Sequence, residues 1–437
     1  MVEKVALMGS PDRVIDAGAG TGRYALAAAR RWPKAEIIAV EMDPILASAI
    51  KSNAKAAGVK ITVICDDYLN VTLPAIRGTT AFIGNPPYLR HHDLPAKSKE
   101  WYSSHMKAMG LHASQLAGLQ VYFFLKSALL GHPGDIGCFI TSAEWMETGY
   151  GAGLRSLFCQ MGGSQLTRID PVMQVFQDAL TTSVIASWET GHQGEVVVED
   201  LVGQKASTSY RVSKDWLAAA PKWPGFGRAL PLDQPTGLSL GDFFRITRGQ
   251  VTGMNEVWVA TPETASLIPE RYLVPCVTGA REIIDSGGVL WDRSKLHRVV
   301  DLPANLAELT ASERKGVDRF LKLARERGAD ATYIAAHRKP WWHVGLKAAP
   351  SVIMTYMGRR PPVFARNACG AAVINVAHAL YPTKPMQVRE LDAIVGWLNN
   401  NVRVDEGRTY GGGLVKFEPK EAMRIRIPKG SSAFVAA

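Results

Sequence analysis

Two short segments of the chain carry residue types that could do chemistry together. One is a glycine-rich turn, Asp16-Ala17-Gly18-Ala19-Gly20-Thr21-Gly22, and the other, further along, is Asn85-Pro86-Pro87-Tyr88. Glycines let a backbone pass close to a nucleoside cofactor. An amide oxygen and a proline carbonyl can accept hydrogen bonds from a planar amine, and a tyrosine ring can stack on the base that carries the amine. Together the segments predict methyl transfer from S-adenosylmethionine onto an amino nitrogen.

The glycine-rich turn has the spacing Gly-x-Gly-x-Gly, with Gly18, Gly20 and Gly22. Dinucleotide-binding turns use the different spacing Gly-x-Gly-x-x-Gly. The helix expected after the turn offers unpaired N–H groups that suit the carboxylate of a methionine moiety. Asp16 can accept hydrogen bonds from an ammonium, and Glu41, at the end of the next expected strand, can accept from both ribose hydroxyls. The alternative is a tight structural turn beside a solvated acid.

The Asn-Pro-Pro-Tyr segment can activate an amine by holding it. An exocyclic amine on adenine or cytosine is a poor nucleophile because its lone pair is delocalised into the ring. The side-chain oxygen of Asn85 and the carbonyl of Pro86 can draw its two hydrogens out of the ring plane, and Tyr88 can stack on the base. Positioning then supplies most of the catalysis. The same clamp serves adenine and cytosine, and the alternative is a proline-rich turn after a strand.

The first half of the sequence alternates strand-like and helix-like segments, which is typical of an α/β, Rossmann-like, doubly wound sheet. We expect strands at 13–16, 36–40, 60–65, 81–83, 136–140 and 184–188, and helices at 24–31, 45–57 and 116–130. Ligands bind beyond the carboxyl ends of such strands. Asp16, Glu41, Asp67 and Asn85 all fall at or just after expected strand ends, so we expect them on one rim of the sheet.

Prolines and glycines crowd residues 218–240, which indicates a linker. We therefore expect a catalytic domain over 1–225 and a second domain over 240–437. The second domain loses the strand–helix alternation and is predicted to be α+β. Its expected strands are 257–259, 351–355 and 371–376, and its expected helices are 304–326 and 388–399.

These motifs, in this order, resemble the gamma-type adenine-N6 DNA methyltransferases, the TaqI-like methylases of type II restriction–modification systems. Besides the two segments above, the resemblance includes Asp67-Tyr68-Leu69 and Val175-Phe176-Gln177-Asp178-Ala179, and it extends over nearly the whole chain. It implies that Asp66 lies near the adenine of the cofactor and Asp67 near the target base, although either could simply cap a loop. It also implies that Phe176 is a second stacking aromatic. Residues 240–437 look like the family's target-recognition domain.

The resemblance implies methylation of adenine N6 in duplex DNA after base flipping, with S-adenosylmethionine as cofactor. Duplex DNA is the expected partner, and a separate restriction endonuclease is a second one that the resemblance leaves open. Two alternatives remain: a methyltransferase acting on RNA or on a protein glutamine, and a non-catalytic DNA-binding relative. The second alternative is motivated by one departure, because the family usually carries a Thr-Pro motif before the glycine turn. Only residues 1–12 precede the first strand here, which also leaves no room for a fused nuclease.

Composition and charge agree with this expectation without proving it. The net charge of +10 is a weak pointer to a polyanion such as DNA. The cysteines are scattered without a Cys-x-x-Cys pair, and His91-His92-Asp93 is expected to be a polar loop, so we expect no metal. No apolar segment is long enough to cross a bilayer, and we expect a cytoplasmic protein with no membrane partner. A set of basic residues in the second domain could contact phosphates: Arg325, Arg327, Arg338, Lys339, Lys347, Arg359, Arg360 and Arg366.

Overall fold

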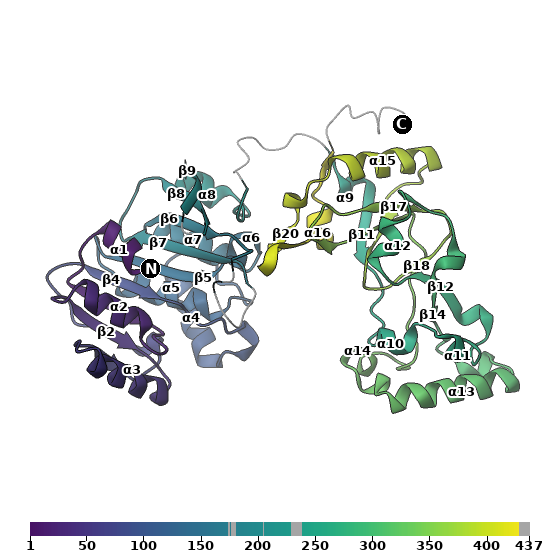
Figure 1. Ribbon diagram of the computed structural model, residues 1–437, viewed down its shortest axis with the longest axis horizontal. Coiled ribbons are helices and arrows are strands. Elements are labelled where there is room, and N and C mark those ends of the chain that lie inside the picture. The colour runs from purple at the N-terminus through teal and green to yellow at the C-terminus, as the bar shows by residue number, and fades with distance from the viewer. Residues whose placement is uncertain (174, 176–180, 204, 229–237, 428–437) are drawn as a thin grey trace. The chain divides into compact units, whose positions relative to one another are not determined.

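The computed structural model describes residues 1–173, 175, 181–203, 205–228 and 238–427 of the 437-residue chain (Figure 1). Two compact units share the chain: Met1–Leu230 with Thr409–Gly413, and Pro231–Arg408 with Leu414–Ala437. The second unit begins at Pro231 and leaves out Thr409–Gly413, whereas the expected second domain runs over 240–437. Thr409–Gly413 belongs to the first unit, where the Gly412 N–H donates to the Pro171 carbonyl at 2.8 Å.

The described part of the first unit is built on a nine-stranded sheet in the order β3-β2-β1-β4-β5-β7-β6-β8-β9. Its strands are β1 (Arg13–Ala17), β2 (Glu36–Val40), β3 (Thr62–Ile64), β4 (Thr80–Gly84), β5 (Ile136–Ser142), β6 (Gly163–Ile169), β7 (Ser183–Glu189), β8 (Val196–Val202) and β9 (Lys205–Val212). Strands β1 to β5 pair in parallel, and β7 runs antiparallel to both β5 and β6. The carboxyl ends of β1, β2, β3 and β4 therefore meet at one rim.

Both faces of the sheet are covered by helices, because alternate strand residues enter different cores (Figure 1). Val14 packs in a core with residues of α1 (Val2–Met8), α2 (Arg23–Arg31) and α3 (Pro44–Ala56). Ile15 packs in the other core, with residues of α4 (Ala96–Ala108), α5 (Leu119–Leu130) and α7 (Ala152–Gln160). Both strand residues are fully buried. The predicted doubly wound α/β class is thus confirmed. The remaining helices of this unit are α6 (Glu144–Glu147) and α8 (Lys214–Ala219), with single 3-10 turns η1 (Tyr68–Asn70) and η2 (His91–Asp93).

The second unit is α+β, as predicted, with several small sheets. One has the order β11-β19-β15-β17-β13, and its strands are β11 (Phe244–Arg248), β19 (His378–Pro382), β15 (Val352–Met354), β17 (Phe364–Asn367) and β13 (Val289–Leu290). Another has the order β14-β12-β18, with β14 (His297–Val300), β12 (Leu273–Val277) and β18 (Ala372–Val373). The short strands of this unit are β10 (Leu238–Ser239), β16 (Met357–Gly358), β21 (Leu414–Lys416) and β22 (Arg426–Ile427), and β20 (Arg408–Tyr410) begins here and continues into the Thr409–Gly413 segment of the first unit. No helix in the described residues of either unit is long and apolar enough to cross a membrane.

Two long helices of the second unit, α13 (Ala311–Glu326) and α15 (Val388–Asn401), lie within the ranges predicted for them or close to those ranges. Its shorter helices are α9 (Leu240–Phe243), α10 (Asn255–Trp258), α11 (Pro262–Ala265), α12 (Ala280–Ile284), α14 (Tyr333–Ala336) and α16 (Pro419–Ala422). The predicted strand at 257–259 is wrong, because Val257 and Trp258 complete α10 and only Val259 makes an isolated bridge, with Val299. Three β-formers in a row gave a strand pattern, and burial of Trp258 in the local core decided otherwise.

Candidate active site

The glycine-rich turn joins β1 to α2 and needs glycine at three positions. Gly18, Gly20 and Gly22 have φ values of 67°, 56° and 78°, a left-handed region that residues with a Cβ rarely adopt. A Cβ at Gly18 would also lie 3.2 Å from the ring of Phe123 in α5 and 3.6 Å from the ring of Pro87. The turn therefore passes directly against the Asn-Pro-Pro-Tyr segment, so the two predicted motifs meet in space.

Asp16 lies beneath the turn and is not among the residues that line the cavity described below. It is fully buried, and its Oδ2 accepts from the Ala25 N–H at 2.8 Å, which fixes the first turn of α2. Burial, and to a smaller extent the nearby Glu41 carboxylate, raises the pKa of Asp16 to about 8. Its Oδ1 has no hydrogen-bond partner among the described residues. Asp16 thus shapes the turn from below.

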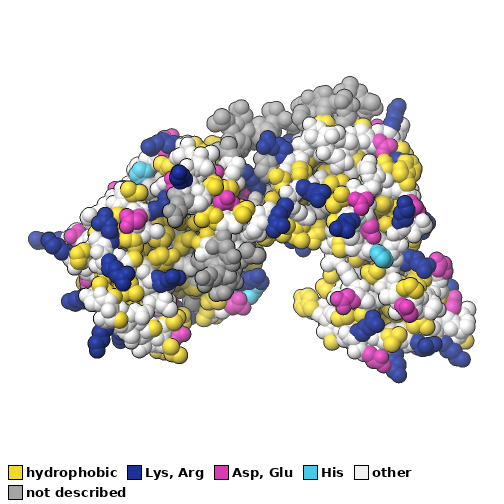
Figure 2. Space-filling model, in the orientation of Figure 1, with side chains coloured by type: hydrophobic (Ala, Val, Ile, Leu, Met, Phe, Trp, Pro, Cys, Tyr) yellow, Lys and Arg dark blue, Asp and Glu magenta, His cyan; other side chains and the backbone are white. Residues whose placement is uncertain are grey.

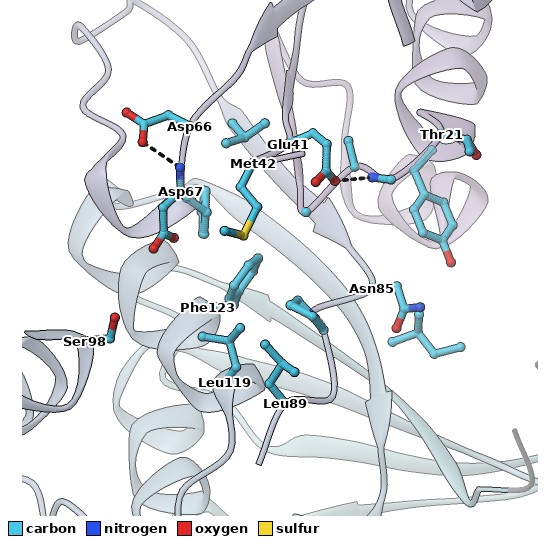
Figure 3. A pocket seen from close by; sticks show the side chains of 18 of the residues that line it. Thr21, Glu41, Met42, Asp66, Asp67, Asn85, Leu89, Ser98, Leu119 and Phe123 are labelled. Carbon is cyan, nitrogen blue, oxygen red and sulfur yellow. Dashed lines mark hydrogen bonds between the residues drawn. The ribbon is translucent and has the colours of Figure 1, made fainter. Parts of the chain in front are cut away.

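A cavity of about 710 Å³ opens above the turn, and we call it the glycine-turn cavity. Figure 3 shows Glu41 and Met42 entering it near Asp66 and Asp67, with Leu89, Leu119, Phe123 and Asn85 arranged around the rest. The full set of lining residues is Gly18, Ala19, Gly20, Thr21, Arg23, Tyr24, Val40, Glu41, Met42, Asp66, Asp67, Tyr68, Asn85, Pro87, Leu89, Asp93, Leu94, Pro95, Ser98, Leu119, Phe123, Ile140 and Val175.

Two carboxylates of this cavity, Glu41 and Asp66, accept hydrogen bonds from backbone N–H groups. Glu41 Oε2 accepts from Gly20 N at 2.7 Å and Oε1 accepts from Asp43 N at 2.9 Å, which ties the end of β2 to the glycine turn. Asp66 accepts from the Asn70 side chain and from Asp67 N, and these hydrogen bonds hold the pKa of its carboxyl below the usual range.

Asp67 Oδ1 accepts from Leu69 N at 3.0 Å and caps η1, so it does serve as a loop cap. A carboxylate oxygen has room for a second donor, so this capping leaves Asp67 able to take a ligand hydrogen bond.

The Asn-Pro-Pro-Tyr segment begins where β4 ends at Gly84. A Cβ there would lie 2.5 Å from the Ala17 carbonyl, so only glycine lets the ends of β4 and β1 approach this closely. Asn85 Oδ1 is buried and has no hydrogen-bond partner among the described residues. Pro86 is buried, whereas Pro87 is exposed and lines the glycine-turn cavity. Buried acceptors are nearly always paired, so the unpaired oxygen of Asn85 is a place for a ligand donor.

Tyr88 lines a different cavity of about 520 Å³, which we call the Tyr88 cavity. Partial burial, with a smaller contribution from Tyr24, raises the pKa of Tyr88 well above its usual value, so its hydroxyl stays protonated at neutral pH. The lining residues are Tyr88, Leu89, Arg90, His91, His92, Leu116, Gly118, Gln120, Ser142, Glu144, Tyr150 and Thr181. Leu89 lines both cavities, so the two adjoin at the segment that carries the Asn-Pro-Pro-Tyr motif.

Most of the residues predicted from the sequence come together here. The glycine-turn cavity gathers Gly18, Gly20, Glu41, Asp66, Asp67, Asn85 and Pro87. The predicted residues that line neither cavity are Asp16, Gly22 and Pro86, and the predicted Phe176 lies outside the described residues. Sequence reasoning missed Phe123 and Leu119, which lie in an apolar helix where core and cavity residues look alike. It also missed Gly84, although a glycine directly before Asn-Pro-Pro-Tyr was a usable signal.

Two of the basic residues predicted to contact phosphates, Arg338 and Arg366, make contacts within the protein. Arg338 donates to the carbonyls of Val251 and Thr252, and Arg366 pairs with Asp392 at 2.5 Å. Lysine and arginine side chains are scattered among acidic ones over the face of each unit in Figure 2. A single basic stripe is therefore not visible on that face. Among the described residues, no cluster of three or more His, Cys, Asp or Glu side chains could hold a metal ion.

Sequence comparisons match three family profiles along the chain. Residues 14–104 match a methyltransferase domain and residues 74–170 match the Eco57I restriction-modification methylase. Residues 232–436 match the C-terminal domain of the type II methyltransferase M.Eco57I.

Individual relatives agree with these profiles. The type II methyltransferase M.XamI of Xanthomonas campestris pv. amaranthicola is 44% identical over 436 residues, which is 98% of this chain and 82% of that protein. A tRNA1(Val) (adenine(37)-N6)-methyltransferase of Shewanella amazonensis is 38% identical over 104 residues, 23% of this chain and 44% of that protein. Among solved structures, the type IIL restriction-modification enzyme MmeI in complex with DNA shares the fold with a TM-score of 0.57 at 11% identity. That match covers 98% of this chain and 63% of the MmeI chain.

The 44% identity to M.XamI over 98% of this chain establishes the family. The chain belongs to the type II methyltransferases of restriction–modification systems, and its methyl donor is S-adenosylmethionine.

Proposed function

We propose that this protein transfers a methyl group from S-adenosylmethionine to N6 of a specific adenine in duplex DNA. One observation carries the proposal: Asn85 Oδ1 is a buried acceptor without a partner among the described residues, at the end of β4 and in the wall of the glycine-turn cavity. Leaving such an acceptor unpaired costs about 1–3 kcal/mol, and a ligand N–H removes that cost. An exocyclic amine is a ligand group with such a hydrogen.

The residues of the glycine-turn cavity fit the cofactor. A Cβ at position 20 would point into open space. Gly18 and Gly20 both have positive φ values, which favour glycine, so no side chain covers the backbone at these two positions of the cavity wall. Glu41 would hold the ribose hydroxyls, Asp66 the adenine amine, and the glycine turn the methionine end. When bound, S-adenosylmethionine supplies a methyl group on a positively charged sulfur.

The residues of the Asn-Pro-Pro-Tyr segment prepare the amine. Asn85 Oδ1 and the Pro86 carbonyl accept its two hydrogens, which localises the nitrogen lone pair and aims it at the donor. Tyr88 stacks on the extruded base, and Asp67 lies near it. The family resemblance gives Phe176 the opposite stacking position. After transfer, the nitrogen carries a positive charge and is acidic, so it loses its proton to solvent.

Adenine rather than cytosine is supported by relatives and not by the clamp chemistry. The gamma-type resemblance covers the order of all the motifs, and the relative from Shewanella amazonensis is named as an adenine-N6 methyltransferase. DNA rather than RNA or protein is supported by the second half of the chain, which matches the C-terminal domain of a type II methyltransferase over 232–436.

We assign catalysis to residues 1–225 and target recognition to residues 240–437. A duplex base must be flipped to reach the clamp, at a cost of a few kcal/mol, and DNA contacts from a recognition domain offset that cost. A separate restriction endonuclease that cuts the unmethylated site is the second partner that this function implies, and both proteins would act in the bacterial cytoplasm.

The test is incubation of random-sequence duplex DNA with methyl-labelled cofactor, followed by digestion to nucleosides and mapping of the modified site. We expect label in N6-methyldeoxyadenosine at one short sequence. Label in N4-methyldeoxycytidine would contradict the adenine assignment. Label that enters RNA or protein but not DNA would contradict the substrate class.

A further inference from the structure

A second buried amide without a hydrogen-bond partner lies in the Tyr88 cavity. Gln120 is the second residue of α5, its side chain is only 6% exposed, and its Oε1 has no partner among the described residues. Nothing in the methyl-transfer scheme above uses this residue. Because the oxygen and nitrogen of a carboxamide can exchange places by a half-turn, a bound ligand decides which of the two it meets.

The backbone ties Gln120 to the Asn-Pro-Pro-Tyr segment. The Leu119 N–H donates to the Leu89 carbonyl at 3.0 Å, and a Cβ at Gly118 would lie 3.0 Å from the same oxygen. Leu89 follows Tyr88 directly and lines both cavities. The start of α5 is thus fixed against the segment that carries the clamp, and Gln120 and Tyr88 line the same cavity.

Gln120 offers the donor that an extruded adenine still needs. Once Asn85 and Pro86 take both hydrogens of the amine, the polar groups left on the base are ring nitrogens, which accept. Elsewhere in the cavity wall, Glu144 can only accept, and it already accepts from the Tyr150 hydroxyl at 3.0 Å. Arg90 and His92 in the wall are exposed and can remain hydrated, and His91, Ser142, Tyr150 and Thr181 are half-buried, so Gln120 is the most deeply buried side-chain donor among the residues of this wall. The buried amide gains most from a ligand acceptor.

We infer that Gln120 is a specificity-determining residue whose side-chain N–H donates to N1 of the extruded adenine. The inference rests on the proposed function. N1 lies beside the carbon that bears the amine, so this hydrogen bond fixes the rotation of the base in its plane. It also rejects guanine, whose N1 carries a hydrogen, whereas N7 accepts in both purines and could not tell them apart.

The test is a double-mutant cycle that combines one side-chain substitution with single-atom substitutions in the target base. Duplexes carry adenine, 1-deazaadenine or 7-deazaadenine at the mapped target position. Wild type and Gln120→Met, which preserves side-chain length without a donor, are compared by single-turnover methylation at saturating cofactor. Gln193→Met, on an exposed turn of the same unit, is the matched control.

We expect Gln120→Met to slow methylation of the adenine duplex by roughly tenfold to a hundredfold, the usual value of one base-edge contact. The penalty should persist on 7-deazaadenine and fall below about threefold on 1-deazaadenine, because the acceptor is then already missing. Gln193→Met should match wild type on all three duplexes. An equal penalty on adenine and 1-deazaadenine overturns the inference.

Two readouts separate this inference from its premise and from misfolding. A wild-type protein that methylates no adenine overturns the proposed function, and this inference with it. Should Gln120→Met fail to fold, the wild type alone still decides, because 1-deazaadenine must then react more slowly than 7-deazaadenine. Equal rates on these two duplexes would overturn the role of Gln120 while leaving the proposed function intact.

Discussion

The carboxylates that follow β2 and β3 and the amides at the end of β4 and the start of α5 differ in how many hydrogen bonds they make within the protein. Glu41 and Asp66 accept hydrogen bonds from nearby N–H groups of the protein. Asn85 and Gln120 have buried oxygens without a partner in the described part of the chain. The carboxylate side is therefore held in shape by the protein itself. The amide side is completed by a ligand, which is where discrimination between substrates belongs.

The largest effect should follow removal of the clamp oxygen. Asn85→Ala should lower the single-turnover rate of methylation by about 10²–10³-fold, the usual cost of losing one preorganised polar group at a reacting centre. Cofactor affinity measured by calorimetry should stay near the wild-type value, because Asn85 contributes only one wall of the glycine-turn cavity. A wild-type rate in this variant would refute the clamp. A loss of cofactor affinity would mean that Asn85 binds the cofactor rather than the target base.

Glu41→Ala should show the opposite pattern. Loss of a carboxylate that holds the ribose, and that ties Gly20 to the end of β2, should raise the dissociation constant of S-adenosylmethionine about tenfold to a hundredfold. The rate at saturating cofactor should change much less. Calorimetry measures the first quantity, and Glu100→Ala, an exposed carboxylate on α4, is the control. Unchanged affinity in Glu41→Ala would remove Glu41 from the cofactor site.

A pair of glycine substitutions separates backbone strain from the close approach of the two motifs. Gly58 has a φ of 64° with nothing within 4 Å of a Cβ, so Gly58→Ala should cost about 1–2 kcal/mol in the free energy of unfolding. Gly18→Ala adds contact with Phe123 and Pro87 to similar strain, and should cost more and weaken cofactor binding too. Denaturant unfolding measures the difference. Equal costs with unchanged cofactor affinity would mean that the turn does not press on the clamp segment.

A further prediction concerns the pH dependence of stability. The folded-state pKa of Asp16 is about 8, raised by burial from 3.8, so between these values the folded chain holds a proton that the unfolded chain has released. This contribution to stability is fully present below about pH 4 and is lost as the pH rises through about 8. Asp16→Asn keeps an oxygen for the Ala25 N–H and removes the titration. Its Tm should therefore fall less than that of wild type from pH 5 to 8, and parallel curves would contradict the assignment.

Local patterns in the sequence predict the part of the first unit that matters for the site. The parallel strands β1 to β5 were predicted within a few residues because short buried runs end in polar or glycine positions. The strands β6, β8 and β9 were not predicted; β6 pairs with β7 and β8 further along the chain, whereas β8 and β9 are neighbours in sequence that pair with each other. The functional residues at the ends of β1 to β4 could be predicted because each buried run is followed by a polar residue or a glycine.

Whether a side chain is buried in the core or lines a cavity could not be predicted from the sequence. Asp16 was predicted to accept hydrogen bonds from the cofactor, and the sequence does not show that its side chain is fully buried and that one of its oxygens accepts from Ala25 N. Phe123 and Gln120 sit in an apolar helix whose residues nearly all looked like core. The structure shows that Leu119, Gln120 and Phe123 of this helix line the two cavities.

The most direct test of the central claim is a structure of the protein with a cognate duplex and a non-reactive cofactor analogue. The account predicts an extruded adenine whose amine nitrogen lies about 3 Å from both Asn85 Oδ1 and the Pro86 carbonyl, with the analogue in the glycine-turn cavity. An adenine that stays stacked in the duplex, or an amine held by other residues far from Asn85, would contradict it.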